Sequence, residues 1–492
     1  MTTKRKILIT LLVIVLAIVA IGAWLVRGNP ADYSVDEVTG TEPLLSDPEA
    51  ESFPTVAIAE PIGWKDGEAP TAAEGLTVSR FAEGLDHPRV VHTLPNGDVL
   101  VTLTRAPAGE PMGGIEGLIA GWLFEKAGAA GASPEQLVLL RDEDGDGVAE
   151  TRKTLRDDLA SPSGIEWRDD KLYIANHDAL VSFDYELGAD VVSGDPVKLM
   201  DLPPAGSHWM RNIFMPPAGD VIYIAVGSDS NIGENGMEIE KGRAAIHEYN
   251  IESGKSRIYA TGLRNANGMA YNPWSEELWT TVNERDMLGS DMVPDYLTNV
   301  PIGVNYGWPW FYYKDNVDDR VEASMPATLP GYVRNPEFAL GPHVAALGLV
   351  FTEEGSRMGA SFGSGAFIAR HGSWNRKPPS GYDLVYVAFD ERGNPQGKPV
   401  EVLGDFLTGE GTTRGRPTWV DWAGDGALLM TDDTAGIIWR VIAESAEPAA
   451  KPVAPVRSSL APRRNLTGDP QGRFNQDFSR EAKAAAAAKA AE

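Results

Sequence analysis

The feature that most constrains this chain is a pattern that occurs six times along it. A short apolar run is followed by a turn rich in Pro, Gly, Asn or Asp, and then by a second β-branched or aromatic run. Such runs around a turn are typical of antiparallel hairpins. The hairpins recur roughly every 50 to 80 residues, which leaves room for two outer strands in each unit. We therefore predict an all-β fold, a six-bladed β-propeller. The units begin at His87, Ser161, Met210, Leu263, Ala345 and Arg414.

The N-terminus indicates a membrane anchor. Three cationic residues, Lys4-Arg5-Lys6, precede the uncharged run Ile7–Val26, which is long enough to span a bilayer. We predict a single-pass inner-membrane protein with a periplasmic catalytic domain; a cleaved signal peptide is the alternative, with a weak site at 20–22. The predicted parts are an anchor over 1–28, a solvated linker over 29–75, the propeller over 76–443 and a Pro/Ala-rich tail over 444–492.

Charge and cysteine content exclude several functions. Asp and Glu total 70 against 43 Lys and Arg, a net charge of −27, so the chain repels nucleic acid. There is no cysteine, which excludes disulfides, c-type haem and iron–sulfur ligation. Any redox chemistry therefore needs a non-covalent cofactor, and the electrons must pass to an external acceptor.

Arginines stand at similar positions in four of the units. Arg89, Arg211, Arg264 and Arg416 each lie just before a first apolar run. Equivalent positions in a propeller converge on one end of the axis. Clustered cations in an acidic protein indicate a small polyanionic ligand, because the arginine fork binds carboxylates in a bidentate manner. The alternative is that each arginine forms a salt bridge with a neighbouring carboxylate at the rim.

Two loops add candidates for binding a planar anion. "ARHGSWNRKPPSGY" contains Arg376 and Lys377, and "NYGWPW" places Trp308 among other aromatic residues. Cations and flat rings together can hold such a ligand. The alternative for the aromatic residues is packing within a blade.

Several motifs together resemble a known family. "PNGDVLV", "HWMRN", "GLRNANGMAYNP", "PDYLTNV", "NYGWPW", "HGSWNR" and "GRPTWVDWAGDGALLMTDDTAGIIWRV" occur in this order between Leu76 and Ile442. The chain resembles the sorbosone dehydrogenase-type branch of the pyrroloquinoline-quinone (PQQ) sugar dehydrogenases, which are six-bladed propellers of the soluble glucose dehydrogenase type. The resemblance implies PQQ and Ca²⁺ at one mouth of the propeller.

The resemblance also implies roles for individual residues. His208 would be the general base, with a pKa near neutrality and a rate that rises through an apparent pKa of about 6 to 8. His343 is the next candidate. Arg264 and Asn265 would contact the reactive quinone oxygens and share in catalysis. The cofactor-binding candidates are Arg211, Arg264, Asn265, Arg376, Lys377, Arg414, Arg416 and Trp308.

Two places are predicted to bind calcium. By the resemblance, the calcium beside the cofactor would lie near Arg285 and Asp286, although the Gly-Pro pair of the family is absent there. Separately, "DEDGDGVAE" has the spacing of a calcium loop but lacks an acidic twelfth residue, so it is either a partial calcium clip or a solvated acidic turn. The clip ligands would be Asp142, Asp144, Asp146 and Glu150.

We therefore expect a quinoprotein dehydrogenase that oxidises a sugar, an aldose, sorbosone or a related alcohol or aldehyde, by hydride transfer to PQQ. The family's substrate cannot be transferred, because Ser207 and Leu103 stand where relatives carry carboxylates. A calcium-dependent, lactonase-like hydrolase is one alternative and would need carboxylates and amides at the mouth. A non-enzymatic propeller that binds a partner or an anionic glycan is the other.

Overall fold

The computed structural model describes residues 5, 9–17, 22, 27–108, 121–409, 411–444, 446 and 454–455. Among these residues, helix is assigned at 5, 9–17 and 22 and over 121–126, and η1 (Leu329–Gly331) and η2 (Ala360–Phe362) are single 3₁₀ turns. None of the helices in these residues is long and apolar enough to cross a membrane. This finding contradicts the predicted single-pass inner-membrane location and gives no support to the predicted membrane contact through an N-terminal helix. Residues 6–8, 18–21 and 23–26 of the predicted span, and most of the predicted tail, lie outside the described residues.

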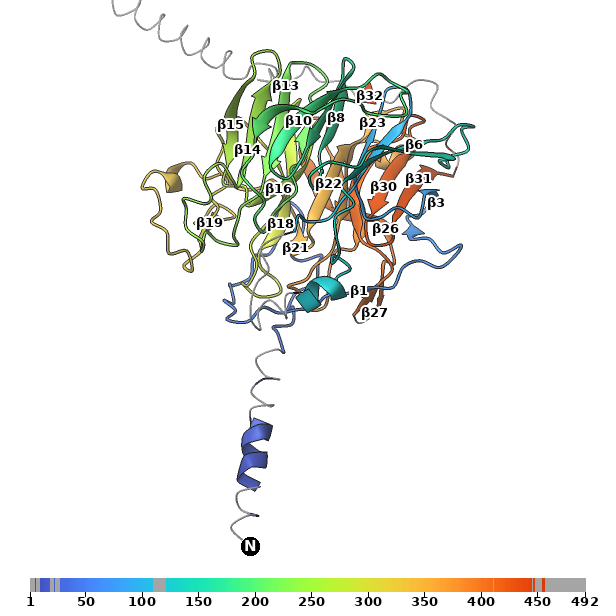
Figure 1. Cartoon of the computed structure of the whole chain (residues 1–492). Helices are drawn as coiled ribbons and strands as arrows, with labels where there is room; N and C mark the ends of the chain where they lie inside the picture. Colours follow the sequence, from blue (N-terminus) through green and yellow to red (C-terminus); the bar gives the residue numbers. More distant parts are fainter. Residues whose placement is uncertain are drawn as a thin grey trace, which may run out of the picture.

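Six antiparallel sheets of four or five strands make up the body of the molecule (Figure 1). The first three follow one another in sequence, each with its strands in chain order. They consist of β4 (Pro88–Thr93), β5 (Val99–Leu103), β6 (Gln136–Arg141) and β7 (Thr151–Arg156); β8 (Ile165–Arg168), β9 (Lys171–Ala175), β10 (Ala179–Asp184) and β11 (Val197–Asp201); and β12 (Ile213–Phe214), β13 (Val221–Val226), β14 (Ala245–Asn250) and β15 (Lys255–Thr261).

The other three sheets recruit strands from further away in the chain. The fourth takes its last strand after a long excursion, the fifth gains a short fifth strand, β2, and the sixth is completed by β3. They consist of β16 (Asn265–Tyr271), β17 (Leu278–Asn283), β18 (Pro294–Asn299) and β21 (Phe338–Pro342); β22 (Ala346–Phe351), β24 (Gly365–Arg370), β25 (Asp383–Phe389), β26 (Pro395–Gly404) and β2 (Thr71–Ala72); and β29 (Pro417–Trp422), β30 (Leu428–Asp432), β31 (Ile437–Ala443) and β3 (Leu76–Ala82). Small ladders join β1 (Glu60–Pro61), β28 (Thr412–Thr413) and β27 (Leu407–Gly409), β19 (Phe311–Tyr312) and β20 (Asn316–Val317), and β23 (Glu353–Glu354) and β32 (Ala454–Pro455).

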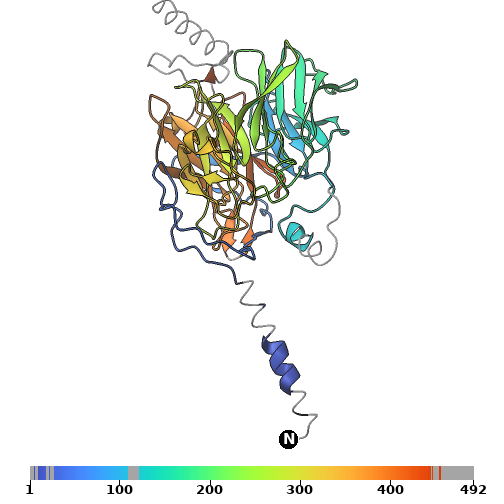
Figure 2. The same cartoon turned by 90° about the vertical axis from the view of Figure 1, so that its left-hand side faces the viewer.

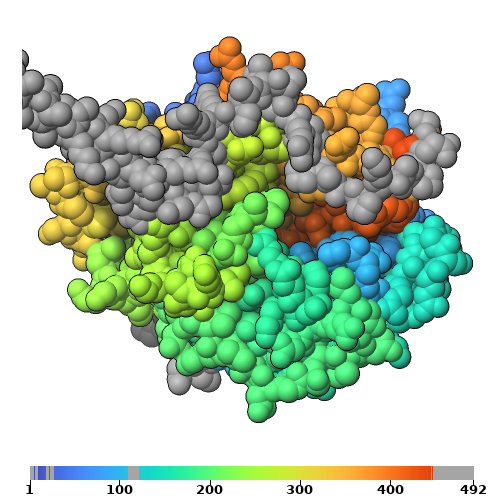
Figure 3. All heavy atoms as spheres, turned by 90° about the horizontal axis from the view of Figure 1, so that it is seen from above, coloured from blue at the N-terminus to red at the C-terminus, as the bar shows by residue number. Residues whose placement is uncertain are grey.

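The first strands of the six sheets form a closed circuit. β4, β8, β12, β16, β22 and β29 contact one another in this order, and β29 contacts β4 again. Seen from above, the colours of the chain follow one another around the molecule (Figure 3). The predicted all-β class is confirmed, and the arrangement is propeller-like.

The circuit is closed by pairing the two ends of the repeating region. β3 pairs antiparallel with β31, with Val78 opposite Val441. Inner strands such as β5, β13 and β30 are buried along their whole length, since each packs between two neighbouring sheets, whereas the outer strands β7 and β11 are largely exposed. The apolar runs detected in the sequence are these inner strands.

Residues 29–64, which we call the N-terminal strap, differ from the expected solvated linker. The strap crosses one end of the sheets as the blue segment in Figures 1 and 2. Val38 and Thr55 are fully buried, Gly40 forms a bridge with Ala339, and β1 pairs with β28. The strap has no periodic pattern because its backbone groups bond to strands and loops of other parts of the chain rather than within an element of its own.

Trp64 fixes the end of the strap. Its ring packs 5.3 Å from Phe406 and 5.4 Å from Trp439, and its Nε1 donates to Asp432 Oδ2 at 3.1 Å. We expect Trp64→Ala to lower the free energy of unfolding by about 2–4 kcal/mol, because it removes a partly buried aromatic side chain that packs on two core rings. Denaturant unfolding measures this. Trp374→Ala, at a tryptophan that is 38% exposed, is the control; equal losses in both variants would contradict the role of Trp64.

Candidate functional site

One end of the sheet circuit, which we call the mouth, gathers the predicted site residues. In an antiparallel sheet a first strand begins at the end where the second strand finishes. The residues before β12, β16, β22 and β29 therefore lie beside the loops that follow β17, β24 and β30. The strap contacts the loops after β17 and β24, as shown by the bonds Glu51 N to Met287 O and Ala57 N to Trp374 O.

His208 lies in the loop before β12 with one ring nitrogen held. Its Nδ1 is 2.9 Å from Ser228 O and 3.1 Å from Ser228 Oγ. Because a carbonyl oxygen only accepts, Nδ1 carries the proton, and Nε2 is the basic nitrogen of the neutral ring. Asn265 lies beside it across Gly227: a Cβ at Gly227 would be 2.3 Å from Asn265 Oδ1 and 2.6 Å from His208 Cβ. Only glycine lets the two side chains approach in this way.

The pKa of His208 differs from the near-neutral value expected from the sequence. Burial, and then the charge of Arg264, lower it to about 3, although the hydrogen bond to Ser228 O raises it in part. The imidazole is therefore neutral across the physiological range, as a base must be.

Arg264 is fixed by an ion pair with Asp286, at 3.1 Å between Nη2 and Oδ2. The other carboxylate oxygen of Asp286, Oδ1, is 3.2 Å from His343 Nδ1, and His343 Nε2 is 3.1 Å from Gly289 O. Both oxygens are acceptors, so both nitrogens of His343 carry protons. Burial lowers the pKa of His343, but Asp286 outweighs it and the net shift is upward. His343 is thus a cation beside Asp286 and a poor second candidate for the base.

Asn231 joins these groups and was missed by the sequence analysis. Its backbone oxygen accepts from Arg264 Nε at 3.1 Å and from Trp308 Nε1 at 2.9 Å. Its side-chain Oδ1 accepts from Arg264 Nη2 and from Asp286 N, both at 2.9 Å. Trp308 therefore helps to position Arg264 through their shared acceptor, Asn231 O. An asparagine in a Gly- and Ser-rich loop carries no sequence signal for this role.

A second cluster at the mouth surrounds Asp433. Arg89 Nη1 donates to Asp433 Oδ2, His371 Nε2 is 2.9 Å from the same oxygen, and His87 Nε2 is 3.5 Å away. Burial alone raises the pKa of Asp433, but the histidines and Arg89 hold it well below its usual range. Burial lowers the pKa of His371 to about 3 and that of His87 to about 4. Arg89 therefore forms a salt bridge with a carboxylate, which was the alternative to binding an anionic ligand.

Arg416 is placed differently from the other arginines. Its Nε and Nη2 donate to the carbonyls of His371 and Gly372, each at 3.0 Å, and its guanidinium lies 5.4 Å from the centroid of the Tyr382 ring. In the part of the chain that the structure describes, no carboxylate oxygen lies within the 4.0 Å of an ion pair. Its charge is therefore available to an anionic ligand.

The remaining predicted cations serve the protein itself. Arg211 is fully buried and donates to the carbonyls of His208, Met210 and Pro203 in its own loop. Arg376 pairs with Asp291 and donates to Tyr33 O of the strap, both at 3.1 Å. Arg414 lies 5.4 Å from the Trp64 ring, and Lys377 is exposed beside Pro30.

The loop predicted to hold the cofactor calcium has its oxygens in use. Arg264 donates to Glu284 O, Arg320 donates to the carbonyls of Asp286 and Met287, Glu49 N donates to Leu288 O, and His343 bonds to Gly289 O. The Arg285 side chain points into a buried pair with Glu284, at 3.0 Å, and with Asp318, at 3.2 Å. The arrangement at Arg285 and Asp286 does not fit a calcium ion.

The acidic loop between β6 and β7 brings its predicted ligands together. The ligand atoms of Asp142, Asp144, Asp146 and Glu150 all lie within 4.8 Å of one another. The loop docks on the closing strand β3, because Ala149 N donates to Phe81 O at 2.8 Å. An ion here would fix the conformation of the loop through which the first sheet contacts the last one.

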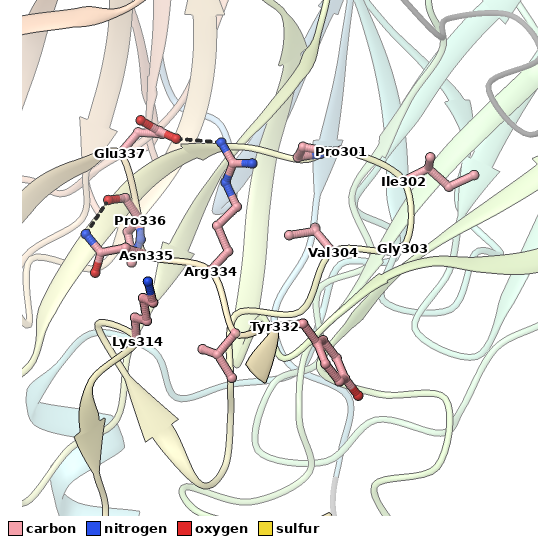
Figure 4. Close-up of a pocket in the computed structure, with 11 residues that line it drawn as sticks. Pro301, Ile302, Gly303, Val304, Lys314, Tyr332, Arg334, Asn335, Pro336 and Glu337 are labelled. Atoms are coloured by element: carbon pink, nitrogen blue, oxygen red, sulfur yellow. Dashed lines mark hydrogen bonds and ion pairs between the residues drawn. The ribbon is translucent and has the colours of Figure 1, made fainter. Parts of the chain in front are cut away.

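A surface pocket lies elsewhere, along residues 301–304 and 332–337 (Figure 4). Arg334 points into it and pairs with Glu337 at 2.8 Å. None of the predicted site residues lines this pocket.

Two protein families match the chain. The TrAA12-like family matches residues 136–301 and 320–444, more than half of the chain, and the chain belongs to this family. Glucose / Sorbosone dehydrogenase matches residues 237–369, which confirms the predicted resemblance to the PQQ sugar dehydrogenases.

Individual relatives are more distant. An uncharacterised protein of Borreliella burgdorferi is 28% identical over 315 residues, 60% of this chain and 80% of that protein. The aldose sugar dehydrogenase YliI of Escherichia coli is 47% identical over 60 residues, 12% of this chain and 14% of that protein. The PQQ domain of Coprinopsis cinerea pyranose dehydrogenase, in its holo form, superposes with a TM-score of 0.60 at 19% identity, covering 78% of this chain and all of that domain (100%). This last likeness shows the fold alone.

Proposed function

We propose that the chain is a PQQ-dependent oxidoreductase that acts on a sugar, built as a six-bladed propeller. The observation that carries the proposal is the ring of His208 at the mouth: its Nδ1 is held by Ser228, which leaves Nε2 as the basic nitrogen, and its Cβ approaches Asn265 across Gly227. The similarity of the chain to sugar dehydrogenases supports the same activity, the oxidation of a sugar. Electrons would pass to a separate acceptor, because the chain lacks cysteine and with it any c-type haem site.

The residues at the mouth fit part of a planar tricarboxylate. Arg416 offers a guanidinium with no carboxylate partner among the described residues. Asn265 approaches His208 across Gly227, and Arg264 is close enough for its charge to lower the pKa of His208. Arg264 keeps one N–H on Nη1 after its bonds to Asn231, Glu284 and Asp286. PQQ would supply the hydride acceptor. Arg211, Arg376, Lys377 and Arg414 are engaged elsewhere or exposed, and we assign them no contact with it.

His208 and its neighbours define the proton chemistry. Nε2 of His208 would accept the proton of the sugar hydroxyl while Nδ1–H stays bonded to Ser228 O, which fixes the orientation of the ring. Arg264 and Asn265 would donate to the oxygen on which negative charge develops. Asp286 keeps Arg264 in place, so that its remaining N–H is already directed before the reaction.

One observation favours the hydrolase alternative. Amide groups form a ladder at the mouth: Asn265 Nδ2 and Asn267 Nδ2 both donate to Asn283 Oδ1 at 3.0 Å, and Asn212 Nδ2 is 3.4 Å from Asn267 Oδ1. Two of the carboxylates there, Asp286 and Asp433, are paired with arginine. A guanidinium in contact with a carboxylate opposes binding of a metal ion, so the dehydrogenase is the better-supported function.

His208→Asn tests the base. We expect turnover to fall by at least about a hundredfold while PQQ affinity and melting temperature stay close to the parent values. The base acts only when unprotonated. With a pKa of about 3, His208 is unprotonated throughout about pH 5 to 8. Its ionisation should therefore cause no rise of kcat/KM with pH in this range for the parent. Dye-linked assays over a sugar panel measure this; a limb near neutrality that disappears in the variant would contradict the lowered pKa.

Arg416 tests the cofactor site. Arg416→Ala should weaken PQQ binding roughly ten- to a hundredfold, or about 1.5–3 kcal/mol, because it removes a charge-assisted bond to a carboxylate. Arg414→Ala, which removes an arginine two residues away that lies against Trp64, is the matched control and should bind as the parent does. Absorbance titration with PQQ gives both constants, and equal affinities would refute the assignment.

We also propose that the acidic loop binds Ca²⁺ as a structural clip. Changing Asp142, Asp144 and Asp146 together to Asn should abolish the rise in melting temperature that calcium gives the parent, because only the folded loop gathers the ligands. Melting scans with calcium and with chelator measure the effect. If the calcium-dependent shift survives in the triple variant, the loop is an ordinary acidic turn.

A further inference from the structure

A long excursion between β18 and β21 contributes a residue to the loop beside the candidate site. The excursion carries β19 and β20 and projects from the side of the molecule, where Figure 1 shows β19 in yellow-green. Arg320 follows β20 and reaches back to residues 286 and 287. This arginine was not among the predicted site residues.

The guanidinium of Arg320 is surrounded by four oxygens. Nη1 donates to Asp286 O at 3.0 Å and to Met287 O at 2.8 Å. Nε donates to Asp318 Oδ1 at 2.9 Å, and Nη2 donates to Asp318 Oδ2 at 2.8 Å. Asp318 is buried, with 1% of its side chain exposed, whereas the Arg320 side chain is 21% exposed. Two backbone carbonyls and a bidentate carboxylate thus bind one cationic group.

This is the kind of oxygen set that calcium takes in proteins, except that the cation here belongs to the chain. We infer that Arg320 is a positioning residue that replaces a divalent cation at loop 284–291. It binds the backbone of Asp286, the residue that pairs with Arg264. Arg320 therefore acts on the candidate site through Asp286 and Arg264, without touching His208.

The inference predicts that removing the guanidinium creates a cation site. In Arg320→Ala the carbonyls of Asp286 and Met287 and the carboxylate of Asp318 each lose one of their donors. Each keeps a second donor, which is Asn231 Nδ2, Glu51 N and Arg285 Nη1 respectively. The loss of these hydrogen bonds and of one positive charge should loosen the loop. A hard divalent cation with oxygen preference can then enter and restore the charge. Arg320→Lys keeps a positive charge in place and should gain no such response.

The experiment uses the full chain in which Asp142, Asp144 and Asp146 are already Asn, so that the acidic loop gives no calcium signal. Melting temperature is measured for this parent, Arg320→Ala, Arg320→Lys and the control Arg334→Ala, each with chelator and with about 1 mM CaCl₂. Arg334 lies in the same excursion and pairs with the half-exposed Glu337. We expect Arg320→Ala to melt about 4 °C or more below the parent with chelator and to regain at least half of the loss with calcium. Arg320→Lys and Arg334→Ala should not respond to calcium.

A loss in Arg320→Ala without recovery by calcium, or equal calcium responses in all variants, would overturn the inference. If Arg320→Ala fails to fold with chelator, its soluble yield with and without calcium replaces the melting scan. One further readout rests on the proposed function: PQQ affinity in Arg320→Ala should fall with chelator and recover with calcium. Calcium rescue of melting with no PQQ binding by any variant would confirm the positioning role and contradict the proposed function.

Discussion

The ion pair between Arg264 and Asp286 is the interaction on which the candidate site depends. Both groups are shielded from water, and such a pair stabilises only where the remaining donors and acceptors are also bonded. Asn231, Glu284 O and His343 provide those bonds. The result is an arginine that cannot rotate, held close enough to lower the pKa of His208. The site is therefore rigid before any ligand enters.

Segments outside the repeating sheets supply much of this rigidity. The strap bonds to the loop after β17 through Glu49 and Glu51, and the excursion before β21 bonds to it through Arg320. A ring of sheets by itself would leave that loop bonded on one side only. The mouth of this protein is thus defined by its insertions as much as by its repeats.

The sequence predicted what local pattern can encode. Alternating runs around Pro-, Gly- and Asp-rich turns located the inner strands. The structure brings His208, Arg264 and Asn265, which the motifs "HWMRN" and "LRN" singled out, to the same end of the sheets. The sequence could not predict which arginines already have a carboxylate partner. The partners Asp433, Asp286 and Asp291 are separated along the chain from the arginines they neutralise, and only the fold brings each pair together. The packing of the strap was not predicted because its hydrogen bonds are to other segments of the chain. The low pKa of His208 was not predicted because the burial of a side chain is not visible in a sequence.

A crystal structure of the full chain grown with PQQ and without added metal would show whether the mouth binds the cofactor. We expect planar density between His208 and Arg416, with the bond from Arg264 to Asp286 intact and Arg320 still bound to the carbonyls of residues 286 and 287. Density for PQQ at another place, or at the mouth with loop 284–291 opened and a metal ion in the position of Arg320, would contradict this expectation.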